Sequence, residues 1–243
     1  MNHMKRGEFM YYNQNLPYNI FLNNINGNIN NMYSCACTKS YFRVLNAVEG
    51  YPAVDVYVNE MLLSSNLKYS EFSRYMKFMP GSYKLTVYPS GSKKEPILET
   101  SIKIGENLAY TGVLSGNIKD LSDLSIYMMP DKKEKQAMDN MSAVKVINLI
   151  NNSVPLELLT GDGTILFSDL EYADITNNVA LPSGTYTLHL RPKGSDKNIL
   201  IVPSVDFAPR MYYTLYLIGE YGEDKIKIEM LIPEDGINYL DLC

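Results

Sequence analysis

Histidine, the side chain most often used for acid–base catalysis near neutral pH, is rare in this sequence of 243 residues. It has two histidines, His3 and His189, and the second lies on the polar face of a predicted strand. That position favours an exposed strand residue over a general base. The sequence contains no Gly-x-Ser-x-Gly elbow, phosphate loop or zinc-ligand spacing. We therefore expect a protein that is not an enzyme, with no catalytic residues and no cofactor.

Carboxylates gather in Asp169, Glu171 and Asp174, and Asp162 lies in a glycine-rich turn. Hard oxygen ligands of this kind can hold calcium, but several must converge on one ion, and the ligand spacing of an EF-hand is missing. A solvated loop is therefore favoured over a calcium site, and we predict no metal. Asp55 could serve as a catalytic acid only with a second carboxylate beside it.

The three cysteines, Cys35, Cys37 and Cys243, all lie outside the segments predicted to fold as sandwiches. Because their number is odd, complete oxidation requires at least one bond to another molecule. A disulfide between Cys35 and Cys37 would close a very small, strained ring, whereas either can pair with Cys243 of a neighbouring copy. The sequence thus predicts intermolecular disulfides, with three reduced thiols in a cytosol as the alternative.

Tyrosine is abundant, with 20 copies, and several fall outside the predicted cores. The five that we single out for partner binding are Tyr57, Tyr88, Tyr127, Tyr212 and Tyr216. An exposed row of tyrosines would suit a partner protein or a sugar. Ordinary cross-strand pairing on a half-covered sheet explains the same residues equally well.

The elements that carry these side chains belong to an internal repeat, the strongest signal in the sequence. The two copies match with a nearly constant offset, which slips once at the first hairpin, where Asn59-Glu60 faces the longer Thr160-Gly161-Asp162-Gly163. A duplicated β-fold tolerates such length differences at turns. The matching segments are Phe42–Asn46 and Val144–Asn148, Leu62–Tyr69 and Ile165–Tyr172, Pro80–Leu85 and Ser183–Leu188, Pro89–Ser92 and Pro192–Ser195, Tyr110–Thr111 and Tyr213–Thr214, and Pro130–Asp131 and Pro233–Glu234.

Both copies show the two-residue hydrophobic period of β-strands. Within residues 83–88 and 186–191, side chains of an apolar face alternate with more polar ones. Clusters of Gly, Pro, Asn and Ser separate such runs at short intervals. Roughly seven short strands per copy indicate an immunoglobulin-like fold. We therefore predict an all-β protein of two tandem immunoglobulin-like antiparallel β-sandwiches behind a flexible N-terminal tail.

The predicted first sandwich spans residues 41–131, and the second spans 142–243 together with a short C-terminal extension. A charged linker at 132–141 joins them. Residues 1–40 form an Asn- and Tyr-rich tail or connector whose composition cannot build its own core. A strand-like apolar patch in this tail could add a strand to, or clasp, a neighbouring copy. The patch comprises Tyr18, Ile20, Phe21 and Leu22.

Charge and hydropathy exclude some classes of partner. The net charge of −5 argues against nucleic acid, because phosphate binding needs clustered Lys and Arg, and the one dense basic run, Lys132-Lys133-Glu134-Lys135, carries its own acid and fits a solvated linker. No apolar run approaches the roughly 20 residues of a membrane-spanning helix, so we expect no membrane insertion. No hydrophobic region follows Lys5 and Arg6, so we expect no signal peptide. The protein would be cytosolic at synthesis, with a spore or cell surface as its destination after assembly.

Several of these motifs resemble the bacterial domain-of-unknown-function 4397 family. They are Pro52–Asn59, Met79–Tyr83 and Tyr110–Thr111 in the first copy, and Leu181–Tyr186 and Arg191–Ser195 in the second. The resemblance covers residues 41–235 and implies repeated β-sandwich domains on exported or surface proteins, without catalytic residues. The second copy departs from the family at Val154–Leu158, where the family has a Val-Asp-Val-Tyr-Val strand, and the family's usual export signal is missing.

Two functions fit the sequence. In the first, the chain is a non-catalytic structural protein that assembles with itself into a homo-oligomer or fibre, crosslinked through the tail and C-terminal cysteines. Its layout is similar to that of bacterial spore appendage fibre subunits, and spore proteins need no export signal because the mother cell lyses around them. In the second, the chain is a surface adhesion module that binds a glycan or a surface protein through exposed tyrosines and loops.

Overall fold

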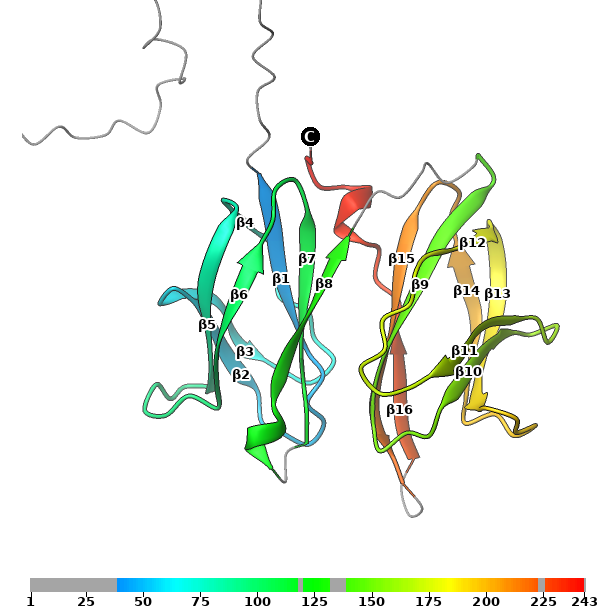
Figure 1. Cartoon of the computed structure of the whole chain (residues 1–243), viewed down its shortest axis with the longest axis horizontal. Helices are drawn as coiled ribbons and strands as arrows, with labels where there is room; N and C mark the ends of the chain where they lie inside the picture. Colours follow the sequence, from blue (N-terminus) through cyan, green and yellow to red (C-terminus); the bar gives the residue numbers. More distant parts are fainter. Residues whose placement is uncertain (1–38, 118–119, 132–138, 223–225, 243) are drawn as a thin grey trace, which may run out of the picture. The chain divides into compact units, whose positions relative to one another are not determined.

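The computed structural model describes residues 39–117, 120–131, 139–222 and 226–242 (Figure 1). Within these residues the chain folds as sixteen β-strands and two 3-10 helices, η2 (Leu121–Asp123) and η3 (Gly236–Asn238). Strands β1–β8 form one sandwich, and β9–β16 repeat the same order in a second. The predicted all-β class and the tandem sandwiches are therefore confirmed. The described part of the chain has no helix long and apolar enough to cross a membrane.

Each sandwich consists of two four-stranded sheets (Figure 1). In the first, β4-β1-β7-β8 is called here the inner sheet and β3-β2-β5-β6 the outer sheet. The strands are β1 (Ser40–Asn46), β2 (Val54–Val58), β3 (Met61–Leu67), β4 (Met76–Phe78), β5 (Gly81–Pro89), β6 (Leu98–Ile104), β7 (Ala109–Ser115) and β8 (Ser125–Asp131).

The second sandwich has β12-β9-β15-β16 as its inner sheet and β11-β10-β13-β14 as its outer sheet. The strands are β9 (Met141–Asn151), β10 (Leu156–Thr160), β11 (Ile165–Leu170), β12 (Val179–Pro182), β13 (Gly184–Pro192), β14 (Leu200–Phe207), β15 (Tyr212–Tyr221) and β16 (Ile226–Leu231). The predicted slip at the first hairpin is confirmed, because the turn between β10 and β11 is longer than the two-residue turn Asn59-Glu60 between β2 and β3.

Alternating apolar residues fill a separate core between the two sheets of each sandwich. Val54, Val56 and Val58 project from β2 into the first core, and Leu188 and Leu190 project from β13 into the second. This is the two-residue period that the sequence showed, because every second side chain of a strand faces the same way. The intervening residues of the outer sheets are left to face solvent or a partner.

The sequence predicted antiparallel sandwiches, but the sheets are not purely antiparallel. β1 pairs in parallel with β7, and β9 pairs in parallel with β15, while every other ladder in the described residues is antiparallel. After β1 the chain passes through β2 and β3 of the outer sheet, β4 of the inner sheet, and β5 and β6 of the outer sheet before it places β7 beside β1. A parallel pair needs a long crossover connection of this kind, which local sequence patterns do not reveal.

The two inner sheets contact each other through a third apolar cluster. From the first sandwich it includes Leu45, Ala47, Val113 and Met129, and from the second Ile147, Leu149, Tyr216 and Ile218. All eight side chains are buried. Equivalent strands of the repeat supply much of this cluster, since Leu45 of β1 matches Ile147 of β9. The inner face of each sandwich is therefore occupied by the other copy, which leaves the outer sheets as the open faces.

Candidate functional site

The cysteine and tail predictions fall on residues that lie outside the described part of the chain. These residues are Cys35, Cys37, Cys243, Tyr18, Ile20, Phe21 and Leu22. Predicted disulfides and strand donation therefore stay predictions.

The expectation that five tyrosines form an exposed row is wrong for three of them. Tyr216 is fully buried against Phe72 in the contact between the sandwiches, with ring centroids 5.4 Å apart. Tyr212 and Tyr57 are 7% and 8% exposed. Tyr88 and Tyr127 are partly buried and pack edge-on against other tyrosine rings. The period-2 pattern could not show that Tyr216 lies where one copy covers the other, or that Lys93 and Tyr88 cover Tyr57.

Other tyrosines have structural roles that the repeat could have revealed. The Tyr83 hydroxyl donates a hydrogen bond to the Met79 carbonyl at 2.7 Å, and its counterpart Tyr186 donates to the Pro182 carbonyl at 2.7 Å. Tyr110 and its counterpart Tyr213 each accept a hydrogen bond from a backbone N–H five residues earlier. Because each bond recurs in both copies, these hydroxyls serve the fold rather than a partner.

The acidic residues considered for calcium or catalysis are engaged locally. Asp169 pairs with Lys193, and Asp174 accepts a hydrogen bond from the Glu171 backbone N–H at 2.9 Å. Asp55 accepts hydrogen bonds from the backbone N–H groups of two residues and from Ser90, which hold the pKa of its carboxyl below the ordinary value against the opposing effect of burial. No three His, Cys, Asp or Glu side chains converge as metal ligands within the described ranges.

The outer sheet of the second sandwich carries a row of cross-strand partners with an exposed isoleucine at each end. The cross-strand partners Ile165–Leu159–His189–Ile201 cross all four strands, β11-β10-β13-β14, and so lie on one face. Ile165 is 49% exposed and Ile201 is 53% exposed. Leu159 is buried between them although it does not belong to the core cluster. We call these four residues the outer row.

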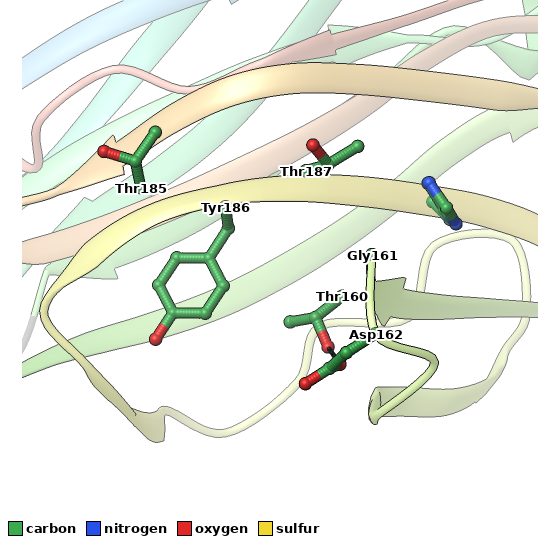
Figure 2. A pocket seen from close by; sticks show the side chains of 7 residues that line it. Thr160, Gly161, Asp162, Thr185, Tyr186 and Thr187 are labelled. Carbon is green, nitrogen blue, oxygen red and sulfur yellow. Dashed lines mark hydrogen bonds between the residues drawn. The ribbon is translucent and has the colours of Figure 1, made fainter.

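A hollow of about 460 Å³ adjoins the outer row at His189. Figure 2 shows Thr185, Tyr186 and Thr187 along β13 and Thr160, Gly161 and Asp162 at the end of β10. The hollow exists because the longer turn after β10 extends beside β13, and a Cβ atom on Gly161 would lie 3.2 Å from Cβ of Thr187. The hydrogen bond from Thr160 to Asp162 fixes this turn and, as the largest cause, lowers the pKa of the Asp162 carboxyl. The hollow thus presents hydroxyl groups, one carboxylate and one imidazole.

Charged residues bound the outer row on the other side. Arg191 Nε lies 3.0 Å from Glu157 Oε2, one step along β13 and β10 from His189 and Leu159 on the same face. Both ions are paired with each other and are partly or largely shielded from solvent. The outer row therefore has polar residues on both sides, as the rim of a protein-binding surface does.

The equivalent face of the first sandwich has a different centre and a charged far edge. Its cross-strand row is Leu62–Tyr57–Thr86–Glu99. Lys93 Nζ lies 4.0 Å from the centre of the Tyr57 ring, and the Tyr88 ring packs edge-on against it. Since the second copy has Leu159 in the place of Tyr57, the repeat has diverged at the centre of this face. Both rows begin with an exposed aliphatic residue, Leu62 at 45% and Ile165 at 49%, and they differ at the far edge, where the first sandwich has Glu99 and the second has the exposed Ile201.

A family model described as a domain of unknown function (DUF4397) matches residues 40–155 and, in a second copy, residues 142–237. The chain belongs to the DUF4397 family. The resemblance noted from the motifs is thereby confirmed for both copies. The DUF4397 description names no activity, so it adds no catalytic or binding residue to the site described above. A search of curated proteins finds no match.

Among solved structures, this DUF4397 chain is similar at 10% identity to the TIE protein of Bacillus anthracis, with a TM-score of 0.25 over 74% of this chain and 34% of the other. It therefore spans about a third of that protein's length. A family CBM26 module of Eubacterium rectale Amy13K, solved with maltoheptaose, shares 9% identity with a TM-score of 0.22 over 80% of this chain and 98% of the other. A candidate adhesin of Bacteroides ovatus shares 7% identity with a TM-score of 0.24 over 81% and 95%.

Proposed function

We propose that this protein is a non-catalytic assembly protein whose second sandwich accepts an apolar segment of another copy on its outer sheet. The observation that carries the proposal is the outer row, with Ile165 and Ile201 about half exposed at opposite edges of one face. Burial of apolar surface contributes roughly 25 cal/mol per Å² to the free energy of association. An apolar segment that lies across the row would cover both isoleucines.

The tail supplies an occupant of suitable chemistry. Its patch Tyr18, Ile20, Phe21 and Leu22 is apolar and includes β-branched and aromatic residues that favour extended structure. The chain between Leu22 and Lys39 can span roughly 60 Å when extended, which is enough to reach a neighbouring molecule. Docking in this way brings Cys35 and Cys37 to a boundary between copies, where a neighbour's Cys243 can form a disulfide. The resulting homo-oligomer or fibre would belong at a spore or cell surface.

Light scattering on four forms of the protein tests this proposal. We expect the full-length protein to be oligomeric, and both the Ile165→Ser/Ile201→Ser double variant and a form lacking residues 1–38 to be monomeric. The matched control is Met61→Ser/Leu62→Ser, which removes two side chains of similar exposure, 47% and 45%, from β3 of the first sandwich. If the control dissociates as readily as the outer-row variant, or if the full-length protein is a monomer, the proposal is wrong.

The hollow supports a second candidate, adhesion through a glycan. Its hydroxyl groups and the Asp162 carboxylate could exchange hydrogen bonds with sugar hydroxyls, beside an apolar row that could contact a sugar face. Glycan-array screening of the double sandwich tests this reading. Binding that is lost in Thr187→Val but retained in Ile201→Ser would favour adhesion over assembly. A blank array from a folded protein would count against it.

A further inference from the structure

The contact between the inner sheets contains a buried ionic cluster in addition to its apolar side chains. Asp131 ends β8, Asp235 follows β16, and the two are 1% and 2% exposed. Lys145 of β9 places its Nζ 3.7 Å from Asp131 Oδ1 and 3.8 Å from Asp235 Oδ2. The same ammonium group donates a hydrogen bond to the Pro130 carbonyl at 3.0 Å. One lysine is therefore shared between two buried carboxylates at distances beyond a hydrogen bond.

The other neighbours do not complete the cluster. Asp131 Oδ2 accepts hydrogen bonds from the Gly236 backbone N–H at 2.8 Å and from the Tyr75 hydroxyl at 3.3 Å. Oδ1 of Asp131 and Oδ1 of Asp235 are buried without a hydrogen-bond partner among the described residues. The remaining titratable groups that face the two carboxyls are Arg43, Tyr216 and Tyr239, and Thr214 beside Asp235 opposes the effect of burial on the pKa of that carboxyl.

Arg43 does not neutralise the pair through a hydrogen bond. Its Nε donates to Thr111 Oγ1 at 2.9 Å, and its guanidinium lies 4.5 Å from the ring centres of both Phe72 and Tyr75. The side chain is thus held by β7 and by two aromatic rings. Two carboxylates buried with imperfect pairing are costly, because burial removes their hydration and the shared lysine restores only part of it. A proton on one carboxyl removes a charge and supplies an O–H donor.

We propose that Asp131, Lys145 and Asp235 form a proton-operated clasp, in which closure of the contact between the two sandwiches takes up one proton on the carboxyl pair. The two carboxyls come from different sandwiches, and Lys145 of the second sandwich lies near both. Separation of the inner sheets would hydrate the carboxyls and let both ionise. Acidification would therefore tighten the pair of sandwiches, and neutral pH would loosen it.

The titration expected for these groups agrees with this direction. Burial, followed by the charge of Asp235, raises the pKa of Asp131 from 3.8 to about 7, and burial raises the pKa of Asp235. Between pH 3.8 and about pH 7, the closed state therefore binds more protons than the open state. The opening equilibrium constant should then rise by up to about tenfold per pH unit from pH 4 to 7 and level off above pH 7.

The experiment uses the absence of tryptophan from the sequence. Phe72→Trp in the full-length protein places a single tryptophan against Tyr216, across the contact, and it can be excited apart from the tyrosines. We expect acrylamide quenching of this tryptophan to increase as pH rises from 5 to 7.5, and to stay constant over that range when Asp131→Asn is added. Equal pH dependence with and without Asp131→Asn, or none in either protein, would overturn the proposal.

A titration of the unaltered protein keeps the clasp testable if the variants do not fold. Carbon-detected NMR of the side-chain carboxyls should show one of the pair titrating near pH 7. If both Asp131 and Asp235 titrate near pH 4, the closed contact holds no extra proton and the clasp does not exist.

Discussion

Asn46 and Asn148 occupy equivalent positions in β1 and β9, and each is fully buried. The Asn46 side-chain amide donates to the Leu67 carbonyl at 3.1 Å, and its carbonyl oxygen accepts from the Val48 backbone N–H at 3.1 Å. Asn148 makes the same two bonds with Leu170 and Ile150, at 3.0 Å and 3.1 Å. Each asparagine thus ties an inner strand to the last residue of an outer strand.

Replacement by alanine should destabilise the sandwich that contains the substitution. Asn46→Ala leaves a backbone carbonyl and a backbone N–H without this partner in a buried site, and each such group costs about 1–3 kcal/mol. We expect a loss of about 2–6 kcal/mol from the free energy of unfolding, measured by urea titration with far-ultraviolet circular dichroism. Asn46→Asp keeps the acceptor but removes the donor and buries a charge, so it should be at least as damaging.

The control is Asn177→Ala, at an exposed position, which should change the free energy of unfolding by less than about 0.5 kcal/mol. Asn148→Ala should reproduce the effect of Asn46→Ala in the second sandwich. A loss below about 1 kcal/mol for either buried substitution would show that these hydrogen bonds do not hold the sheets together, and the structural reasoning would be refuted.

Further predictions follow from the repeat, the sandwich contact and the cysteines. Tyr83→Phe and Tyr186→Phe should each cost about 1 kcal/mol by thermal or urea unfolding, because each removes one hydrogen bond to a backbone carbonyl; no change in either would remove the structural role assigned to these hydroxyls. Residues 41–135 alone should fold cooperatively, but they should self-associate in sedimentation experiments because the apolar inner face is uncovered; failure to fold would mean that the two copies share one core. Non-reducing gels of the oxidised full-length protein should show a ladder that collapses with reductant and is absent in Cys243→Ser; three freely alkylated thiols under oxidising conditions would contradict the crosslinking model.

Local pattern was enough to predict the duplicated sandwiches. Period-2 alternation on β5 and β13 identified the core faces, and the matched turns fixed the equivalence of the copies. The parallel pairing of β1 with β7 was not predictable, because it depends on a crossover through the other sheet. The burial of Tyr216 was missed for a related reason. The sequence pattern of a strand does not distinguish a face that packs against the second copy from a face exposed to solvent when aromatic residues occupy it.

Only part of the candidate site could be predicted from the sequence. His189 was correctly placed on the face of a strand away from the core, but its neighbours Leu159 and Ile201 come from strands whose register no local pattern gives. The clasp was not foreseen, because Asp131, Lys145 and Asp235 are separated in sequence by the linker and by most of the second sandwich. Comparison of the two copies would have helped, since Lys145 occupies the position of Arg43 and both are buried.

The central claim is that the outer row of the second sandwich accepts the tail of another copy. It is tested most directly by NMR titration of an isotope-labelled protein of residues 39–243 with an unlabelled peptide of residues 14–26. We predict saturable shifts centred on Leu159, Ile165, His189 and Ile201, with no comparable shifts at Tyr57 or Thr86 of the first sandwich. Shifts spread evenly over both sandwiches, or none at millimolar peptide, would contradict the account.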